Sequence, residues 1–198
     1  MTPRLYAETL ALLAIPAVGL VTVLTFLRNT PAAMQSSFYI VILDGAGYPG
    51  MVIGSLIALS ELAAAVGSLL AARIPTTVPL AGTVAAAVAC AIACMTVTPL
   101  IAGIIVALGA AAVLRGVAQG INQPILSVML AREAGRHQGL ALGLRTTAHR
   151  LASMLLPVTM GLAVELWGVE TGFISVGLFT IALCCAVPIL VLRKRRLA

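Results

Sequence analysis

The sequence predicts an all-α, polytopic membrane protein, a bundle of six transmembrane helices. Composition is the first reason, because 61% of the 198 residues are hydrophobic and only 9% are charged. A soluble domain of this size could not bury so much apolar surface. The second reason is that the apolar residues gather in six runs. Each run reaches the roughly 20 residues that a helix needs to cross a bilayer.

The six spans follow one another through residues 1–198 as a single membrane domain with short connections. A short amphipathic segment at residues 5–13 leads into the first span. The longest spans exceed the bilayer thickness, which permits tilt. The sequence places a connection at Thr98 and Pro99, between the third and fourth spans. The spans cover about residues 16–43, 50–74, 78–97, 100–130, 140–167 and 172–192.

Charges outside the spans orient the bundle. With a cytoplasmic N-terminus, the opposite side carries only the acidic residues Asp44, Glu165 and Glu170. An excess of basic residues on one side is typical of the cytoplasmic face, so we expect both termini there. The net charge of +6 therefore reflects topology, and the basic tail is expected to anchor at the interface rather than bind nucleic acid. The basic residues on the cytoplasmic side are Arg4, Arg73, Arg132, Arg136, Arg193, Lys194, Arg195 and Arg196.

Four charged residues fall near the middle of different spans: Arg28, Glu61, Arg115 and Arg150. Each charge at mid-bilayer costs roughly 2.5–3.5 kcal/mol even on lenient insertion scales. The third and sixth spans carry no such charge. The usual reason for accepting these costs is a polar cavity or pathway between helices, and we expect one here.

The first three spans resemble the second three. Spans one and four are long and interrupted by polar residues and a proline, Pro31 in one and Pro124 in the other. Spans two and five carry ionisable residues, whereas spans three and six are apolar and contain cysteines. Because each unit has three spans, the second unit lies inverted in the membrane. An inverted three-plus-three repeat is a building plan of secondary transporters, with sites near the midplane.

Local sequence adds a family resemblance. Residues 35–39 and 45–54 are similar to the end of the seventh helix and the start of the eighth in the major facilitator superfamily (MFS). Residues 136–143 resemble the loop into its eleventh helix, residues 157–161 resemble the end of that helix, and residues 168–173 resemble the turn into its twelfth. The whole chain thus resembles one six-helix half of an MFS transporter, most closely the C-terminal half. In that family the first, second, fourth and fifth helices of each half line the cavity.

The resemblance implies a secondary active transporter that moves a small polar or anionic organic solute by alternating access, with proton-coupled efflux as one form. Its expected partners are the lipid bilayer, the solute, and a second bundle supplied by a homodimer or a sister half. A bacterial inner membrane is the expected location. The alternative is a non-transporting membrane subunit or scaffold derived from an MFS half. An intramembrane enzyme is disfavoured, because no Gly-x-Ser-x-Gly motif or metal-binding histidine pair is present.

The spans offer a cavity wall rich in hydrogen-bond donors. Arg145 and His149 are one helical turn apart and share a face, as do Arg115, Gln119 and Asn122. Arginine forks suit carboxylate and phosphate groups, which favours an anionic or polar solute. The alternative is that Arg28 or Arg115 only pairs with Glu61 and holds helices together. The predicted cavity residues are Arg28, Gln35, Arg115, Gln119, Asn122, Gln123, Arg145 and Arg150.

Two residues are candidates for proton coupling. Glu61 is a carboxyl within a span, where burial favours the protonated form, although a permanent ion pair with an arginine is the other interpretation. His149 is the second candidate, because an imidazole can both accept and release a proton, although a lone histidine facing a bundle can also be a hydrogen-bonded packing residue. The four cysteines lie in apolar helix and are expected to pack as small hydrophobes. No metal site or cofactor is expected.

Overall fold

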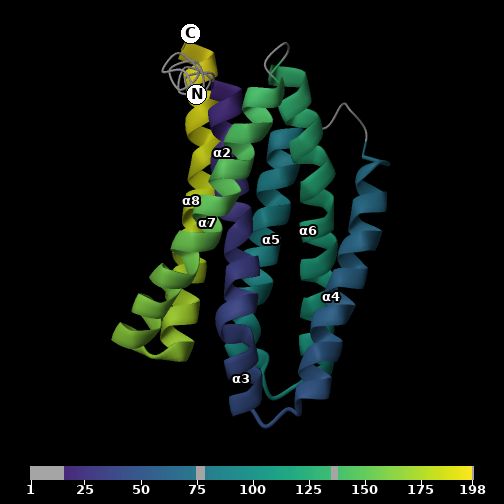
Figure 1. Cartoon of the computed structure of the whole chain (residues 1–198), viewed down its shortest axis with the longest axis vertical. Coiled ribbons are helices and arrows are strands. Elements are labelled where there is room, and N and C mark those ends of the chain that lie inside the picture. Colours follow the sequence, from purple (N-terminus) through teal and green to yellow (C-terminus); the bar gives the residue numbers. More distant parts are fainter. Residues whose placement is uncertain (1–15, 75–78, 135–137, 198) are drawn as a thin grey trace.

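A computed structural model describes residues 16–74, 79–134 and 138–197, and over these ranges the chain is helical with no strand (Figure 1). The predicted lead-in at residues 5–13 lies outside the described residues. Each predicted span overlaps one helical run, with boundaries that differ by a few residues. The elements are α2 (Pro16–Met34), η1 (Gln35–Tyr39), α3 (Ile40–Gly45), α4 (Gly50–Ala71), α5 (Leu80–Ile101), α6 (Ile105–Ala134), α7 (Gln138–Trp167) and α8 (Val169–Leu197).

Four of the described helices are long and apolar enough to cross a membrane. They are Gly50–Ala71, Leu80–Ile101, the Ile105–Arg132 part of α6, and Gln138–Trp167. In α8 a shorter apolar segment covers Val169–Cys184. The structure therefore supports an all-helical membrane bundle, and membrane crossing by the first and last runs stays a prediction.

The first helical run changes its winding in the middle. Between α2 and α3, residues Gln35–Tyr39 form a π-helical turn, one residue wider than an α-turn. Such turns occur mostly as single interruptions of α-helices and are frequent at functional sites. Pro31, which lacks a backbone N–H to donate, lies one turn earlier inside α2. The polar interruption seen in the sequence of this span thus corresponds to a real irregularity in the helix.

The third helix differs from its prediction. Thr98 and Pro99, expected in a connection, lie inside α5, and the chain leaves the helix only after Ile101. A proline removes one helical N–H, and its ring crowds the preceding turn, but Pro99 lies only two residues before the end of α5. The Thr98 hydroxyl donates to the Cys94 carbonyl oxygen at 3.1 Å, so the helix continues with a local polar contact.

The helices pair in a pattern that agrees with the inverted repeat. α4 packs along α6, and α2 packs along α7. If spans one to three correspond to spans four to six, the α4–α6 pair corresponds to the α7–α2 pair. Likewise α5 packs on α6 as α8 packs on α2, while α5 and α8 contact each other. Two apolar clusters fill the interior, one around Leu24 and Ile92 and the other around Leu43 and Phe173.

Glycine lets α4 and α6 approach closely. A Cβ atom on Gly116 would lie 2.2 Å from the Ser60 carbonyl oxygen, and one on Gly120 would lie 2.0 Å from that of Ala64. Gly67 on α4 faces the Val117 backbone in the same way. Gly116 and Gly120 form a G-x-x-x-G pattern, which is typical of close contacts between membrane helices. Helix packing therefore accounts for these glycines.

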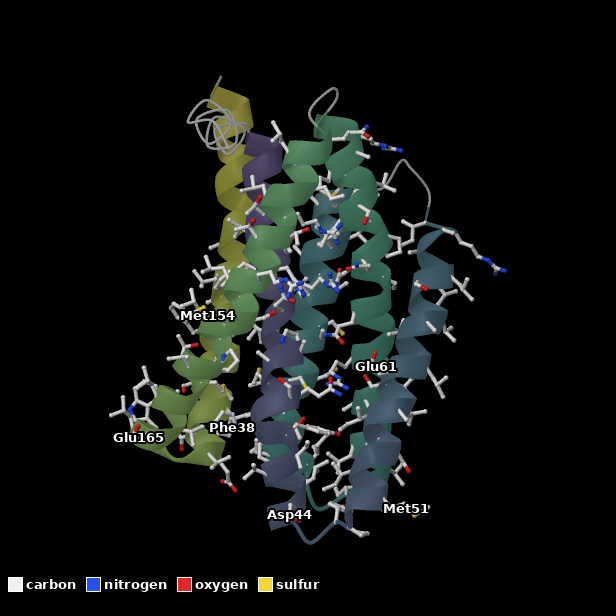
Figure 2. The ribbon with its side chains drawn as sticks, viewed as in Figure 1. Phe38, Asp44, Met51, Glu61, Met154 and Glu165 are labelled. Atoms are coloured by element: carbon white, nitrogen blue, oxygen red, sulfur yellow. The ribbon has the colours of Figure 1, made fainter. Side chains whose placement is uncertain are left out.

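The charged ends of the bundle separate by sign. Figure 2 shows Asp44 and Glu165 at the lower end of the bundle. Arg73 follows the opposite end of α4, and Arg132 lies in the last turn of α6, at that same end. This distribution agrees with the charge asymmetry in the sequence. The assignment of the basic end to the cytoplasm stays a prediction.

Candidate functional site

Polar side chains of α2, α6 and α7 meet around a pocket of about 380 Å³, which we call the arginine pocket. Two arginines face it from different helices, Arg28 from α2 and Arg145 from α7. The pocket thus brings together four residues predicted from sequence, namely Arg28, Gln123, Arg145 and His149. Its lining consists of Thr25, Arg28, Gln123, Leu142, Arg145, Thr146 and His149.

Gln123 joins the two arginines. Its side-chain oxygen accepts a hydrogen bond from Nη1 of Arg28 and another, at 3.2 Å, from Nη2 of Arg145. Nη1 of Arg145 also donates to the Ser127 hydroxyl at 2.9 Å. That hydroxyl donates in turn to the Gln123 carbonyl oxygen at 3.0 Å, so it can only accept from the arginine. One turn of α6 therefore supplies the protein acceptors for both guanidinium groups.

The charge of the arginine pocket is not balanced. None of the described residues that line it is acidic. An amide oxygen and a hydroxyl carry only partial negative charge, so two unit positive charges remain close together. Nε of Arg28 is also buried without a hydrogen-bond partner. A bound anion would satisfy these donors, because charge-assisted bonds from guanidinium to carboxylate or phosphate are strong.

His149 is anchored by a short chain of hydrogen bonds. Its Nδ1 lies 2.8 Å from Oδ1 of Asn29 on α2, and Nδ2 of Asn29 donates to the Thr25 carbonyl oxygen at 2.8 Å. Asn29 is only 6% exposed, so its amide is held firmly by the helix packing. This hydrogen bond orients the imidazole of His149, which is exposed at the edge of the arginine pocket.

Arg115 occupies a separate, deeper position and is only 2% exposed. Its Nη1 donates to Oε1 of Gln35 at 2.7 Å and contacts the Met95 sulfur at 3.3 Å. The guanidinium carbon lies 5.8 Å from the centre of the Tyr39 ring, within cation–π range. Gln35 and Tyr39 are the first and last residues of the π-helical turn, so Arg115 braces that turn from α6.

Glu61 lies near mid-height of α4 (Figure 2), with an exposed side chain, and attracts Arg115 electrostatically. Arg115 donates its hydrogen bonds instead to Gln35 and to the Met95 sulfur. Nε and Nη2 of Arg115 have no partner among the described residues. Both interpretations of Glu61, proton carrier and electrostatic partner, stay predictions.

Three other predicted residues do not line the arginine pocket. Gln119 is half-buried on α6. Asn122 is fully buried, and neither atom of its side-chain amide has a hydrogen-bond partner within the described part of the chain. Arg150 is exposed on α7, one residue after His149. Their roles in a cavity stay predictions.

Sequence reasoning did not include several residues that shape the arginine pocket. Asn29 holds His149, Ser127 accepts from Arg145, and Thr25 lines the wall. The available signal was helical spacing. Thr25 lies about one turn before Arg28 on α2, and Ser127 lies one turn after Gln123 on α6, so both share a face with a predicted residue.

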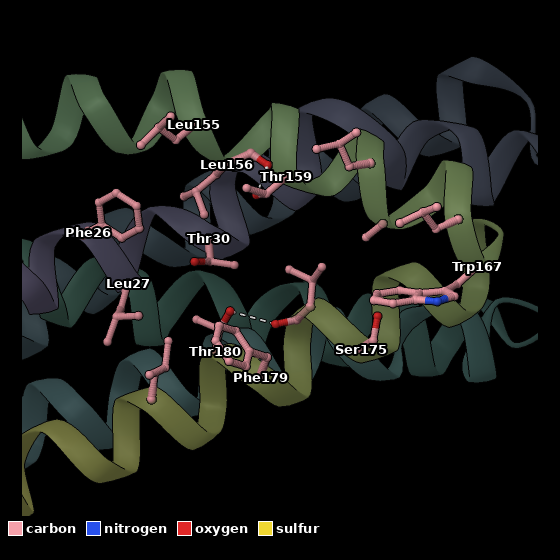
Figure 3. Close-up of a pocket in the computed structure, with 15 residues that line it drawn as sticks. Phe26, Leu27, Thr30, Leu155, Leu156, Thr159, Trp167, Ser175, Phe179 and Thr180 are labelled. Carbon is pink, nitrogen blue, oxygen red and sulfur yellow. Dashed lines mark hydrogen bonds between the residues drawn. The ribbon is translucent and has the colours of Figure 1, made fainter.

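A second, larger pocket of about 670 Å³ lies between α2, α7 and α8 (Figure 3). Leucines and the aromatic residues Phe26, Trp167 and Phe179 dominate its lining, and none of its lining residues is charged. The Thr180 hydroxyl donates back to the carbonyl oxygen of Val176 in its own helix at 2.7 Å. This pocket therefore lacks the groups that would select a charged solute.

The cysteines give no sign of a metal centre in the described structure. Cys90 and Cys94 are half-buried free thiols. Cys184 is buried, and its thiol donates to the Ala85 carbonyl oxygen at 3.3 Å. The side chain of Cys185 is not among those that the structure describes. Among the described residues, no three histidine, cysteine or acidic side chains gather as metal ligands.

An all-helical membrane bundle with ionisable side chains around a pocket between its helices is typical of polytopic membrane transport proteins. The family model described as the Major Facilitator Superfamily matches residues 10–198. The chain therefore belongs to the Major Facilitator Superfamily, whose members are transporters. No curated protein and no solved structure matches the chain significantly.

Proposed function

We propose that this protein transports a small anionic organic solute, which binds in the arginine pocket between α2, α6 and α7. The observation that carries the proposal is the pairing of Arg28 and Arg145 on one amide oxygen, with no acidic residue in the described lining. Placing two positive charges in an apolar bundle is costly. An anionic solute offsets this cost, which a purely structural role for the arginines would not do.

The geometry supports a solute with a carboxylate or phosphate group. Two guanidinium forks from different helices can each give two donors to one anionic group. The Thr146 hydroxyl donates to the Leu142 carbonyl oxygen and keeps its lone pairs for a solute donor. A volume of about 380 Å³ lies at the lower end of the range for small-molecule sites.

A second helical bundle is part of the proposal. The chain resembles one half of a transporter in which two bundles rock around a midplane site. A second copy of the chain or a sister half would close the arginine pocket from the other side. The bacterial inner membrane, cytoplasmic termini and proton-coupled efflux belong to the same proposal. They rest on the family, the short connections and the charge asymmetry.

The test is uptake of radiolabelled succinate and glycerol 3-phosphate into proteoliposomes, with glycerol as the neutral control. Wild-type protein should accumulate at least one of the two anions, and the double variant Arg28→Gln/Arg145→Gln should lose that uptake. Arg73→Gln is the matched control, because it removes an arginine at the end of α4, outside the pocket. Uptake that survives in the double variant would refute the assignment of the site. Binding without uptake would favour the non-transporting subunit.

A further inference from the structure

We propose that the apolar pocket between α2, α7 and α8 binds one membrane phospholipid whose head group carries an amine. An acyl chain of the lipid lies in the pocket, and the head group lies at the Trp167 end, beside Glu165 and Glu170. The apolar pocket shares no lining residue with the arginine pocket. The inference therefore does not depend on the proposed function.

The apolar pocket is a groove that follows the helix axes. Its lining residues recur at helical spacing on α7 from Leu155 to Trp167, and on α8 from Ser175 to Leu183. At the rise of an α-helix, the α7 wall is about 18 Å long. Figure 3 shows Leu155 and Trp167 at opposite ends of the groove. A volume of about 670 Å³ with this shape suits an extended hydrocarbon chain better than a compact solute.

The lining of the groove offers little to a polar solute. None of its described residues is charged. The hydroxyls of Thr159, Ser175 and Thr180 each donate to a carbonyl oxygen of their own helix, at 2.9, 3.1 and 2.7 Å. Their donors are therefore occupied, and apolar atoms dominate the surface. Such a surface holds a hydrocarbon chain through many dispersion contacts.

Large apolar side chains along the groove are exposed. Leu162 is 55% exposed, Leu166 is 72% exposed and Phe179 is 66% exposed. α7, which carries the two leucines, is long and apolar enough to cross a membrane. In a bilayer these side chains face acyl chains, so a lipid enters the groove from the side.

The Trp167 end of the groove supplies polar groups for a head group. Trp167 is 58% exposed, and its indole N–H has no hydrogen-bond partner within the described residues. It can donate to an ester or phosphate oxygen, as tryptophan does at membrane interfaces. Glu165 and Glu170 are both exposed on either side of it in the chain. Residues 151–192 contain no basic side chain, so this end is acidic.

The acidic end selects among phospholipids by charge. The ammonium group of phosphatidylethanolamine has N–H donors that suit a carboxylate. Phosphatidylglycerol carries only negative charge and is repelled, and phosphatidylcholine has a positive charge without an N–H donor. Because exposed charge pairs contribute little, phosphatidylethanolamine should be preferred over phosphatidylglycerol by about fivefold.

The experiment uses Trp167 as the reporter, because it is the one tryptophan of the chain. Its fluorescence is measured in phosphatidylcholine nanodiscs that contain a small fraction of brominated lipid, with bromine on the acyl carbons nearest the head group. Brominated phosphatidylethanolamine, phosphatidylglycerol and phosphatidylcholine with the same chains are compared. In the wild type, half-maximal quenching should need about fivefold less phosphatidylethanolamine than phosphatidylglycerol.

Three variants identify the site. Glu165→Gln/Glu170→Gln should lose the preference for phosphatidylethanolamine. Asp44→Asn is the matched control, because it removes a carboxylate at the same end of the bundle but on α3, and it should keep the preference. Thr159→Phe places a ring in the groove and should remove the extra quenching that phosphatidylethanolamine gives over phosphatidylcholine. Elution as a single species confirms that each variant is folded.

Three outcomes would overturn the inference. The first is equal quenching by phosphatidylethanolamine and phosphatidylglycerol in the wild type. The second is a preference that survives in Glu165→Gln/Glu170→Gln or in Thr159→Phe. The third is a Trp167 that no brominated lipid quenches, which would show that protein, such as a second copy of the chain, covers the groove. Succinate uptake tests the proposed function separately, so the two can fail independently.

Discussion

Arg28 on α2 and Arg145 on α7 donate to the same atom, the side-chain oxygen of Gln123 on α6. The two arginines are 117 positions apart in the chain. Their guanidinium groups nevertheless converge on one neutral acceptor. A carboxylate between them would neutralise part of this charge. The neutral glutamine leaves the positive charge available for a solute.

The first prediction concerns Gln123 itself. Gln123→Glu places a carboxylate between the two arginines and neutralises part of their charge. Anion binding should weaken at least about tenfold, because a unit negative charge beside the anion costs more than ~1.4 kcal/mol. Calorimetric titration with succinate measures the loss. Gln138→Glu adds the same charge at the start of α7 and should change the affinity much less. Equal effects of the two variants would argue against the site.

The second prediction separates two arginines on one helix. Arg145 bonds to Gln123 and Ser127, whereas Arg150 is exposed. Arg145→Gln should weaken succinate binding by about 2 kcal/mol or more, which is over tenfold, because a charge-assisted contact is lost. Arg150→Gln should have a smaller effect. A larger loss in Arg150→Gln would place that arginine in the cavity, as the sequence first suggested, and would displace Arg145.

The third prediction concerns the contact between α4 and α6. Gly120→Ala drives a methyl group to within 2.0 Å of the Ala64 carbonyl oxygen, so the helices must separate. The substitution should cost about 1–3 kcal/mol of unfolding free energy, the range typical of overpacking. Gly109→Ala on the same helix meets open space. That control should be neutral or stabilising by up to about 1 kcal/mol, owing to helix propensity. Unfolding in detergent followed by circular dichroism compares the two.

The fourth prediction concerns Glu61. Glu61→Gln removes an exposed carboxylate that attracts Arg115. Exposed charge pairs contribute little, so the unfolding free energy should fall by less than about 1 kcal/mol. Proton uptake on succinate binding should persist, because the carboxylate acts here as the electrostatic partner of Arg115. Loss of proton uptake with binding retained would instead identify Glu61 as the proton carrier, and loss of folding would identify it as an essential structural partner.

The helices were largely predictable from the sequence. The contacts between side chains of different helices were predictable only in part. Apolar runs predict membrane helices because length and hydropathy are local properties. The rotation of each helix about its axis is not local. These helices are apolar around most of their circumference, so the sequence gives little indication of which face turns inward. The sequence therefore places Arg28, Arg115 and Arg150 near the middle of their spans, but it does not show which of these side chains meet.

Other parts of the site depend on tertiary contacts. The π-helical turn at Gln35–Tyr39 is fixed by Arg115 from another helix, and no pattern within those five residues predicts it. The role of Asn29 depends on α7 lying beside α2, which brings His149 within 2.8 Å. Gln123 and Arg145 were predictable as polar residues of a cavity because each lies inside an apolar span, where an ionisable or amide group is costly.

The most direct test of the account is to locate an anion in the structure. Selenate resembles sulfate and carries an anomalous scatterer, so crystals of the protein soaked in selenate would show its position. The account predicts a selenium peak within hydrogen-bond reach of both Arg28 and Arg145, and its loss in the Arg28→Gln/Arg145→Gln variant. An empty arginine pocket with selenate bound only elsewhere, beside Arg115 or at the basic end of the bundle, would contradict it.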